Sequence, residues 1–571
     1  MKIATITNAT PGTNIYANPI YFWLRSFLDC AHSTNTVEWV YNSWAWLDVD
    51  KVVDECLRAD PDIILLSVFI YNQGETEALI HSIRQASSTV KIVLGGPQVD
   101  GREPLANFIT WPEVNAVVYG DGEEAILGLV QRWEQTGELS AGINCAVPGD
   151  KGTYKRFRWE EWPAYSCFTG ALNTEWRTAS SEILKLYGSN EAGRISVQWP
   201  SETDRGCPYA CTFCDWSAGL HHKLTIRPLE AIYADIDAFV GTDDIIFFNN
   251  ANFFQLKRDL EIVDRLNQLG VIYKITSTSK LQKERVYQYF IDNEQRIQEM
   301  YDSKHLAGTN GIGRIALQSI KLDTLQAINR PEIAWTDHKR YLQEYRAVRR
   351  HNLEVAAEII NDLPLMTDLD YLWQCLELQE AGIDTIIFQN WEFLPNSPAN
   401  DAAYLNQWNL TVVDQITVGS LNCIPGTRLP DLNQVDYKTN YQSKIVVDRT
   451  RGHPNTFAHV TSQLVNWCYK HKKDLKKEIS TKLDFMIGLS QVIDKQLKKL
   501  MIEHEQVIWG LYNPLTKQYC DVDKWIQQYF TLSANTVQKH QAVHPQKDEM
   551  HQMVKKYITY HQLPHQLEKA S

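Results

Sequence analysis

Short apolar segments alternate with amphipathic segments along roughly the first 135 residues of this chain. The apolar segments have the length of β-strands. One of them, "PDIILLSVF", is almost continuously apolar, as in a strand that is covered on both faces. The segments between them, such as "ETEALIHSIRQAS" and "GEEAILGLVQRWEQT", have the spacing of amphipathic helices. This alternation predicts a doubly wound parallel sheet of the Rossmann-like kind.

The alternation resumes near residue 196 and continues through six strand-like segments, which read "RISVQWP", "DDIIFFNN", "VIYKITST", "GRIALQSI", "LEVAAEII" and "DTIIFQNWEFL". Six strand–helix units predict a partial (β/α)6 barrel. The segment before them has weak periodicity, and beyond about residue 430 the strand signals are lost. We therefore expect an α/β chain with four parts: a Rossmann-like sheet over 1–140, a connector over 141–195, a barrel core over 196–428, and a mostly helical domain with a polar tail over 429–571.

Charge and hydropathy argue against several classes of protein. The net charge is −13 over 571 residues, whereas a general nucleic-acid binder needs a basic surface. No window approaches the ~18 uninterrupted apolar residues of a membrane span. The N-terminus "MKIATITNATPG" lacks the order of a signal peptide. We therefore expect a cytoplasmic protein with no membrane partner and no nucleic-acid partner.

Three of the eleven cysteines, Cys207, Cys211 and Cys214, stand together in "TDRGCPYACTFCDW". The other eight are scattered and are typical of small buried side chains. A structural zinc site usually has four ligands, and the nearest further candidates are His221 and His222. Three thiolates instead suit a [4Fe–4S] cluster with one iron left open for a substrate or cofactor. The loop follows the first barrel strand, where barrels of this kind carry their active sites.

The spacing C-x3-C-x2-C after a first barrel strand resembles the motif of the radical S-adenosylmethionine (SAM) enzymes, which also favour an aromatic residue at the position of Phe213. The longer string "ETDRGCPYACTFCDW" resembles one branch of them, the cobalamin-binding-domain radical SAM proteins. Further segments are similar to that branch, so the resemblance covers roughly residues 1–425: "GGPQVD", "VVYGDGEEAI", "PAYSCFTGAL", "FFNNANFFQLKRDLEI", "IALQSIKLDTLQAINRP", "EIINDLPLMTDLDYLWQCLEL" and "FLPNSPANDAAY".

The resemblance implies that the three cysteines hold the cluster and form the catalytic centre. It also implies that the open iron binds SAM and that one electron cleaves SAM to a 5′-deoxyadenosyl radical, which takes a hydrogen atom from the substrate. A reducing protein such as flavodoxin or ferredoxin would supply the electron. By position, the SAM contacts would be Phe213, Asn250, Asn252, Gln318, Ser319 and Asp362.

The resemblance also implies a cobalamin bound by the first domain. Its nucleotide tail would be lined by Ser67, Gly95, Gly96, Gln98, Gly120 and Gly122. Many cobalamin folds supply an axial histidine from a D-x-H-x-x-G loop, but the corresponding "TNATPGTN" contains no histidine. Either cobalamin binds without a histidine ligand, or the domain is empty.

The leading interpretation is an enzyme that transfers a methyl group through cobalamin to an unactivated carbon of a small molecule. The alternatives are a radical SAM cyclisation, oxidation or rearrangement, a non-catalytic cobalamin-binding sensor, and an RNA-modifying enzyme. The last depends on the lysine-rich segment 470–499, which is also typical of a solvated amphipathic helix face. The identity of the substrate and the oligomeric state are not readable from the sequence.

Overall fold

The protein is described from a computed structural model. The residues that the structure describes are 1–10, 15–31, 36–69, 72–187, 196–214, 223–275, 284–304, 312, 314–330, 335–349, 355–360, 363–366, 374–375, 377–378, 380–389, 397–408, 410–417, 442–448, 512–513 and 518–519. In this part of the chain, no helix is both long and apolar enough to cross a membrane.

The first sheet has six strands in the order β3-β1-β4-β5-β6-β7. The first five are parallel, and β7 runs antiparallel to β6. Because the chain moves outward from β1 in both directions, the order reverses between β1 and β4, and doubly wound sheets bind ligands beside such a reversal. The strands are β1 (Lys2–Ile6), β3 (Glu38–Ser43), β4 (Ile63–Ser67), β5 (Lys91–Gly95), β6 (Ala116–Val118) and β7 (Cys145–Ala146).

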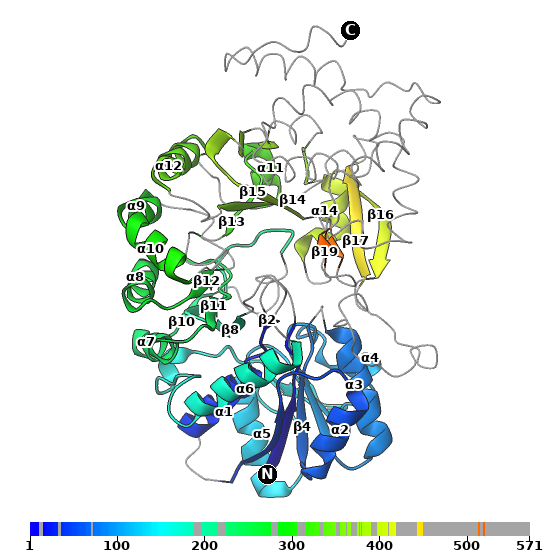
Figure 1. The fold of residues 1–571 in the computed structure, drawn as a ribbon. Helices are drawn as coiled ribbons and strands as arrows, with labels where there is room; N and C mark the ends of the chain where they lie inside the picture. Colours follow the sequence, from blue (N-terminus) through cyan, green and yellow to red (C-terminus); the bar gives the residue numbers. More distant parts are fainter. Residues whose placement is uncertain are drawn as a thin grey trace.

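Helices cover both faces of this sheet (Figure 1). Helices α1 (Ile20–Ala31) and α5 (Glu123–Thr136) pack together on one face, and α2 (Val49–Arg58) and α3 (Gln73–Ala86) pack together on the other. Successive strand residues alternate between the two cores: Ile63 lies with α1 and α5, whereas its neighbour Ile64 lies with α2 and α3. The short η1 (Pro104–Ala106) and α4 (Asn107–Thr110) follow β5. The predicted α/β class with a parallel sheet is confirmed.

All six strands that the sequence predicts after residue 196 are present, and all their pairings are parallel. In the described residues they form two sheets, one with the order β12-β11-β8-β2 and one with the order β13-β14-β15. These strands are β8 (Val197–Ser201), β11 (Ile245–Phe248), β12 (Tyr273–Ile275), β13 (Arg314–Gln318), β14 (Ala356–Ile360) and β15 (Thr385–Gln389).

A layer of helices lies along the outer side of these strands (Figure 1). Its members are α7 (Leu229–Ala238), α8 (Asp259–Leu269), α9 (Glu284–Asp292), α10 (Glu294–Lys304) and α12 (Trp335–Val348). The short α11 (Leu322–Ala327) follows β13. Two short strands, β9 (Asp204–Arg205) and β10 (Thr225–Ile226), form an antiparallel pair after β8. The segment after β15 contains η3 (Pro398–Asn400) and α14 (Ala402–Gln407).

The edge strand β2 (Ile15–Tyr16) belongs to the segment that follows β1, yet it pairs with β8 of the second part. The amide of Ile15 donates to the carbonyl of Ser196 at 3.1 Å, and the amide of Ala17 donates to that of Gln198 at 3.0 Å. The sequence did not predict this strand, because two residues are too few to show a period. The N-terminal segment therefore holds the edge of the sheet that leads to the cysteine loop.

The connector, predicted from its weak periodicity to be irregular, contains a regular helix. Residues Leu172–Tyr187 form α6, a helix of 16 residues. Its buried side chains Leu172, Trp176, Ala179 and Ile183 are spaced by four, three and four residues, which is the pattern of one helix face. The structure also contains the single turn η2 (Trp159–Glu161) in the connector.

The expectation of no strand beyond about residue 430 was wrong. Strand β17 (Gln442–Asp448) pairs antiparallel with β16 (Leu410–Thr417) across the predicted boundary at 428. Its centre reads "KIVV", and such β-branched residues favour strands. A second pair is β18 (Tyr512–Asn513) with β19 (Gln518–Tyr519). The lysine-rich segment 470–499 and the polar tail lie outside the described residues.

Candidate active site at the cysteine loop

The three cysteines lie on one loop directly after β9. Cys207 and Cys211 are buried, Cys214 is half-buried, and none of them forms a disulfide. The amide of Cys214 donates to the carbonyl of Cys211 at 3.2 Å, which closes a tight turn between the last two thiols. Gly206 precedes the first cysteine with a φ of 105°, a conformation that favours glycine.

Two other segments hold the middle of the loop in place. The amide of Thr212 donates to the carbonyl of Ile328 at 3.0 Å, and its carbonyl accepts from the amide of Ala399 at 2.9 Å. The hydroxyl of Thr212 donates to that of Tyr404 at 3.0 Å, and Tyr404 in turn donates to the carbonyl of Ala327 at 3.0 Å. The cysteine loop is therefore fixed between the end of α11 and the segment after β15.

Arg330 brings a buried positive charge to the three thiols. It is 3% exposed, its side chain is hydrogen-bonded with Cys211, and its charge also acts on Cys207 and Cys214. Burial lowers the pKa of Arg330, and the three cysteines oppose that effect. The guanidinium also donates to the carbonyl of Ala316 on β13. The sequence did not indicate that Arg330 belongs to the site. It shows there only an Arg–Pro pair at the end of a predicted helix, which has no specific link to the cysteines.

The donor set fits an iron–sulfur cluster. In the residues described, no group of three His, Cys, Asp or Glu side chains is placed to hold a metal ion. A cubane cluster does not require such convergence, because each thiolate binds a different iron. The buried guanidinium complements the negative charge that three thiolates bring to the loop.

The asparagine side chains at the end of β11 differ in their hydrogen-bond partners. The side chain of Asn250 is occupied: it donates to the hydroxyl of Thr203 at 2.8 Å and to the carbonyl of Asp204 at 3.2 Å. Asn252 is buried and donates to the side chain of Gln255 at 3.1 Å. By contrast, the Oδ1 atom of Asn249 is buried without a hydrogen-bond partner. Asn249 is therefore the better candidate for contact with a ligand.

Gln318 and Ser319, the two residues predicted as SAM contacts at the end of β13, also differ from each other. Gln318 is buried with a φ of 65°, at a register shift between β13 and β14. A non-glycine residue in this conformation is strained, and such strain is frequent at functional sites. The hydroxyl of Ser319 donates to Gln374 at 3.0 Å and accepts from the amide of Lys321 at 3.1 Å. Phe213 is half-buried and packs against the hydrophobic core. Asp362 lies outside the described residues.

The predicted cobalamin contacts Ser67, Gly95, Gly96 and Gln98 come together at the carboxyl ends of β4 and β5. The carbonyl of Gly95 accepts from the amide of Val68 at 2.8 Å, and the amide of Gln98 donates to the carbonyl of Val68 at 3.3 Å. Gly96 has a φ of 109°, and a Cβ atom there would stand 2.4 Å from the carbonyl oxygen of Val68. The backbones of these two strand ends therefore approach so closely that only glycine fits.

Gly120 is exposed at the end of β6, and Gly122 is half-buried at the start of α5. The acidic residues of the same turn face the second half of the chain and bind Arg205, which lies two residues before Cys207. The guanidinium donates to Asp121 at 2.9 Å, to Glu123 at 2.9 and 3.1 Å, and to Glu202 at 2.8 and 3.0 Å.

This group of Arg205 with its three carboxylates, called the Arg205 network below, is buried against aromatic rings. The guanidinium carbon lies 5.8 Å from the ring of Trp23, 5.7 Å from that of Phe157 and 5.4 Å from that of Trp159. Burial lowers the pKa of Arg205, but the three carboxylates outweigh it and raise the pKa well above its ordinary value. The sequence did not reveal this network, since Asp121 and Glu123 lie 84 and 82 residues before Arg205, and only Glu202 is close to it in the sequence.

Two buried carboxyl groups, those of Asp204 and Asp259, interact near the start of the cysteine loop, since Asp204 lies three residues before Cys207. Burial raises the pKa of Asp204 to about 6 and that of Asp259 to about 7, and the charge of Asp204 adds to the second shift. Arg258 lies next to both and lowers both values. The guanidinium of Arg258 donates to the carbonyls of Arg227 and Thr203.

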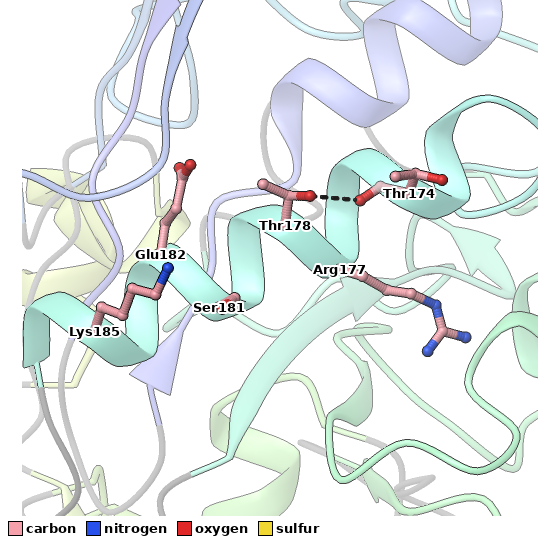
Figure 2. A pocket seen from close by; sticks show the side chains of 6 residues that line it. All are labelled: Thr174, Arg177, Thr178, Ser181, Glu182 and Lys185. Carbon is pink, nitrogen blue, oxygen red and sulfur yellow. Dashed lines mark hydrogen bonds between the residues drawn. The ribbon is translucent and has the colours of Figure 1, made fainter.

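A shallow pocket lies elsewhere, on the outer face of α6 (Figure 2), where the hydroxyl of Thr178 donates to the carbonyl of Thr174 at 2.9 Å. None of the predicted site residues contributes to it. Its lining residues are Thr174, Arg177, Thr178, Ser181, Glu182 and Lys185.

Comparison with known proteins supports both halves of the resemblance. Residues 37–130 match the family model of the B12 binding domain. The chain is 28% identical over 399 residues to the 2-(S-pantetheinyl)-carbapenam-3-carboxylate methyltransferase of Streptantibioticus cattleyicolor, covering 67% of this chain and 54% of that protein. It is also 28% identical over 370 residues to the cobalamin-dependent radical SAM methyltransferase TokK of Streptomyces tokunonensis, covering 62% and 50%. The chain thus spans about half the length of these curated relatives.

Among solved structures, the chain is similar in fold to the radical SAM methyltransferase TsrM of Kitasatospora setae with cobalamin and a [4Fe-4S] cluster bound. The TM-score is 0.56 at 13% identity, and the match covers 82% of this chain and 88% of that one. Together with the B12 binding domain, these findings confirm the resemblance to cobalamin-binding radical SAM proteins.

Proposed function

We propose that this protein is a radical SAM enzyme whose [4Fe–4S] cluster is held by Cys207, Cys211 and Cys214. The observation that carries the proposal is the fixed loop with three thiols, none in a disulfide, complemented by the buried guanidinium of Arg330. When bound, the cluster supplies the electron that cleaves SAM to a 5′-deoxyadenosyl radical. We further propose that the six strands β8, β11, β12, β13, β14 and β15 form one partial (β/α)6 barrel around this loop.

The residues around the loop suit the amino-acid end of SAM. The unpartnered Oδ1 atom of Asn249 can accept a hydrogen bond from an ammonium group. Arg330 can donate to a carboxylate and holds its charge at any working pH. Gln318, at its strained position, presents an amide from the end of β13. These residues would bind and orient SAM against the loop, and the cluster would do the chemistry.

We also propose that cobalamin binds at the carboxyl ends of β4, β5 and β6, where Ser67, Gly95, Gly96 and Gln98 lie together. The match of residues 37–130 to the B12 binding domain supports this assignment, as does the reversal of strand order between β1 and β4. When bound, cobalamin carries the methyl group that is transferred to the substrate. The residues described here supply no histidine ligand at that edge.

The reaction that we propose is methyl transfer to an unactivated carbon of a small molecule, with a reducing protein such as flavodoxin or ferredoxin as the electron source. The names of two relatives support it, because both are methyltransferases. The alternative reaction is a cyclisation, oxidation or rearrangement without methyl transfer. Whether S-adenosylhomocysteine forms distinguishes methyl transfer from this alternative.

The test is anaerobic reconstitution with iron, sulfide and hydroxocobalamin, followed by incubation with SAM and dithionite. We expect about four irons per chain, an absorbance that reports bound cobalamin, and 5′-deoxyadenosine. Cys211→Ala should lose both iron and 5′-deoxyadenosine, whereas Cys30→Ala, outside the loop, should keep both. Fewer than about three irons in the wild-type chain would refute the cluster. S-adenosylhomocysteine formed alongside 5′-deoxyadenosine indicates methyl transfer, and 5′-deoxyadenosine alone indicates the competing reaction.

A further inference from the structure

The sheet β12-β11-β8-β2 has one face against the helices and one face turned away from them, which we call the inner face. Val197, Trp199 and Ile246 point toward the helices, because all three belong to the main hydrophobic core. Side chains alternate along a strand, so Gln198 and Phe247 point to the inner face. Phe247 is buried, yet it lies outside that core, in agreement with this orientation.

Three side chains from three strands form a row on the inner face. The ring of Tyr16 on β2 meets the ring of Phe247 on β11 edge to face, with centroids 4.8 Å apart. The ammonium group of Lys274 on β12 lies 5.8 Å from the centroid of the same Phe247 ring. Lys274 is half-buried. The row therefore consists of two aromatic rings, and the ammonium group of Lys274 is at its end.

The surroundings of Lys274 add to this charge. Burial lowers the pKa of Lys274, and the nearby guanidinium of Arg314, at the start of β13, lowers it further. Arg314 lies 3.6 Å from the carboxylate of Glu358, and the charge of Arg330 acts on that carboxylate too. The carboxylate of Glu358 thus interacts with both Arg314 and Arg330.

In the described part of the chain, no carboxylate forms an ion pair with Lys274. Residues 276–283 after β12 and residues 305–311 before β13 lie outside that part; they read "TSTSKLQK" and "HLAGTNG", and neither stretch contains an acidic residue. Among the described residues, the ring of Phe247 is the group that faces the ammonium of Lys274. A cation–π contact leaves the positive charge of the cation in place, so an anion can bind beside it.

We propose that Lys274 and Arg314 together bind an anionic group of the substrate, a carboxylate or a phosphate, while an apolar part of the substrate lies against the half-buried Tyr16, whose ring packs on the buried Phe247. The inference deepens the proposed function, because it takes the inner face as the substrate side of the same site. It assigns a charge to a substrate whose identity is otherwise open. The charges of Lys274 and Arg314, on the consecutive strands β12 and β13, repel each other, and an anion bound by both would relieve that repulsion.

The experiment uses the full chain and two matched aldehydes, pyridoxal 5′-phosphate and pyridoxal. Each forms a Schiff base with a lysine amine, and borohydride fixes it for peptide mapping. We expect the phosphorylated aldehyde to label Lys274 about tenfold more than the neutral one, since a charge-assisted contact is worth about 1.5 kcal/mol. The exposed Lys51 serves as the reference lysine in the same digest.

Variants and competitors sharpen the result. Arg314→Gln should reduce the preference at Lys274 toward that seen at Lys51, and Lys274→Met should remove the labelled peptide without changing the labelling of Lys51. Inorganic phosphate and 3-phenylpropionate should each protect Lys274 if they bind there, and the stronger of the two indicates which anion the site prefers. The neutral amide of 3-phenylpropionate should not protect.

Equal labelling of Lys274 by both aldehydes, or no protection by either anion, would overturn the proposal. This outcome differs from a failure of the proposed function. Labelling needs neither iron nor SAM, so a chain that takes up no iron can still show the preference. Conversely, a chain that forms 5′-deoxyadenosine can still fail to show it.

Discussion

Gly96 is the residue whose backbone most tightly constrains the proposed cobalamin site. A Cβ atom there would stand 2.4 Å from the carbonyl oxygen and 2.8 Å from the amide nitrogen of Val68, and neither backbone atom can move independently of β4. We therefore expect Gly96→Ala to separate the ends of β4 and β5 and to lower cobalamin affinity by at least about tenfold. Absorbance titration with hydroxocobalamin measures the affinity.

The neighbouring Gly95 provides the matched control. A Cβ atom at Gly95 would meet the side chain of Val118 at 3.6 Å and its carbonyl at 3.7 Å, which are ordinary contacts. Gly95→Ala should therefore keep its fold, and its loss of cobalamin affinity should be smaller than that of Gly96→Ala, because the added methyl group does not separate the two strand ends. Equal affinities for the two variants would show that the close approach at Gly96 does not shape the site.

Arg330 is the residue whose charge should set the properties of the cluster. Removing a buried cation next to three thiolates favours the less negative, oxidised state. For Arg330→Gln we expect a reduction potential lower by about 60 mV or more, the equivalent of one charge-assisted hydrogen bond. Arg330→Lys keeps the charge and should stay closer to the wild-type value. A potentiometric titration followed by electron paramagnetic resonance measures the reduction potential. An unchanged potential in Arg330→Gln would contradict the proposal that Arg330 lies next to the cluster.

At the scale of elements, the Arg205 network joins the turn between β6 and α5 to β9 and the cysteine loop. Arg205 and Glu123 are both buried, and replacing Arg205 leaves Glu123, Asp121 and Glu202 without the cation that they share. Such a change costs about 3–5 kcal/mol. Arg205→Met should therefore lower the thermal unfolding temperature by several degrees and expose the segment around Cys207 to limited proteolysis.

An exposed ion pair in the connector serves as the control for that measurement. Arg158 lies 3.8 Å from Glu160, and both side chains are more than half exposed. Pairs of this kind contribute between 0 and about 1 kcal/mol, so Arg158→Met should barely change the unfolding temperature. If both variants unfold at the same temperature, the network does not fix the loop.

The elements that the sequence predicted correctly are those with a strong local period. Segments such as "DDIIFFNN" and "LEVAAEII" carry their own strand signal, and the structure places strands there. Strand β2 could not be predicted, because its two residues become a strand only by pairing with Val197 and Gln198. The Arg205 network and the place of Arg330 depend on contacts between distant segments, and no spacing along the chain encodes them.

At the scale of the whole molecule, one aromatic core crosses the domain boundaries that the sequence predicts. Phe22 of α1 meets Trp199 of β8 with ring centroids 5.2 Å apart, and Trp176 of α6 lies 6.2 Å from the same indole. The predicted connector therefore fills the core between the two halves. Two proposed cofactor sites on a shared core keep a fixed separation, which a transfer between them requires.

The buried carboxyl groups next to this core predict how stability depends on pH. Asp259 has a pKa raised to about 7, above its unfolded value near 3.9, so the folded chain binds a proton that the unfolded chain releases. Its contribution is fully present below the unfolded pKa and is lost as the pH rises through about 7. The charge of Asp204 favours the protonated form of Asp259, whereas Arg258 opposes it.

Asp259→Asn should remove this dependence, because the amide oxygen can still accept the hydrogen bond from the amide of Leu256, which measures 2.9 Å in the wild-type chain. We expect the unfolding temperature of the variant relative to the wild type to rise between pH about 5 and pH about 8. Taking the difference cancels groups with the opposite sign, such as His338, whose pKa burial lowers to about 4. Glu261→Gln, exposed on the same helix, should show no such rise, and a constant difference for Asp259→Asn would mean that its carboxyl group is ionised throughout.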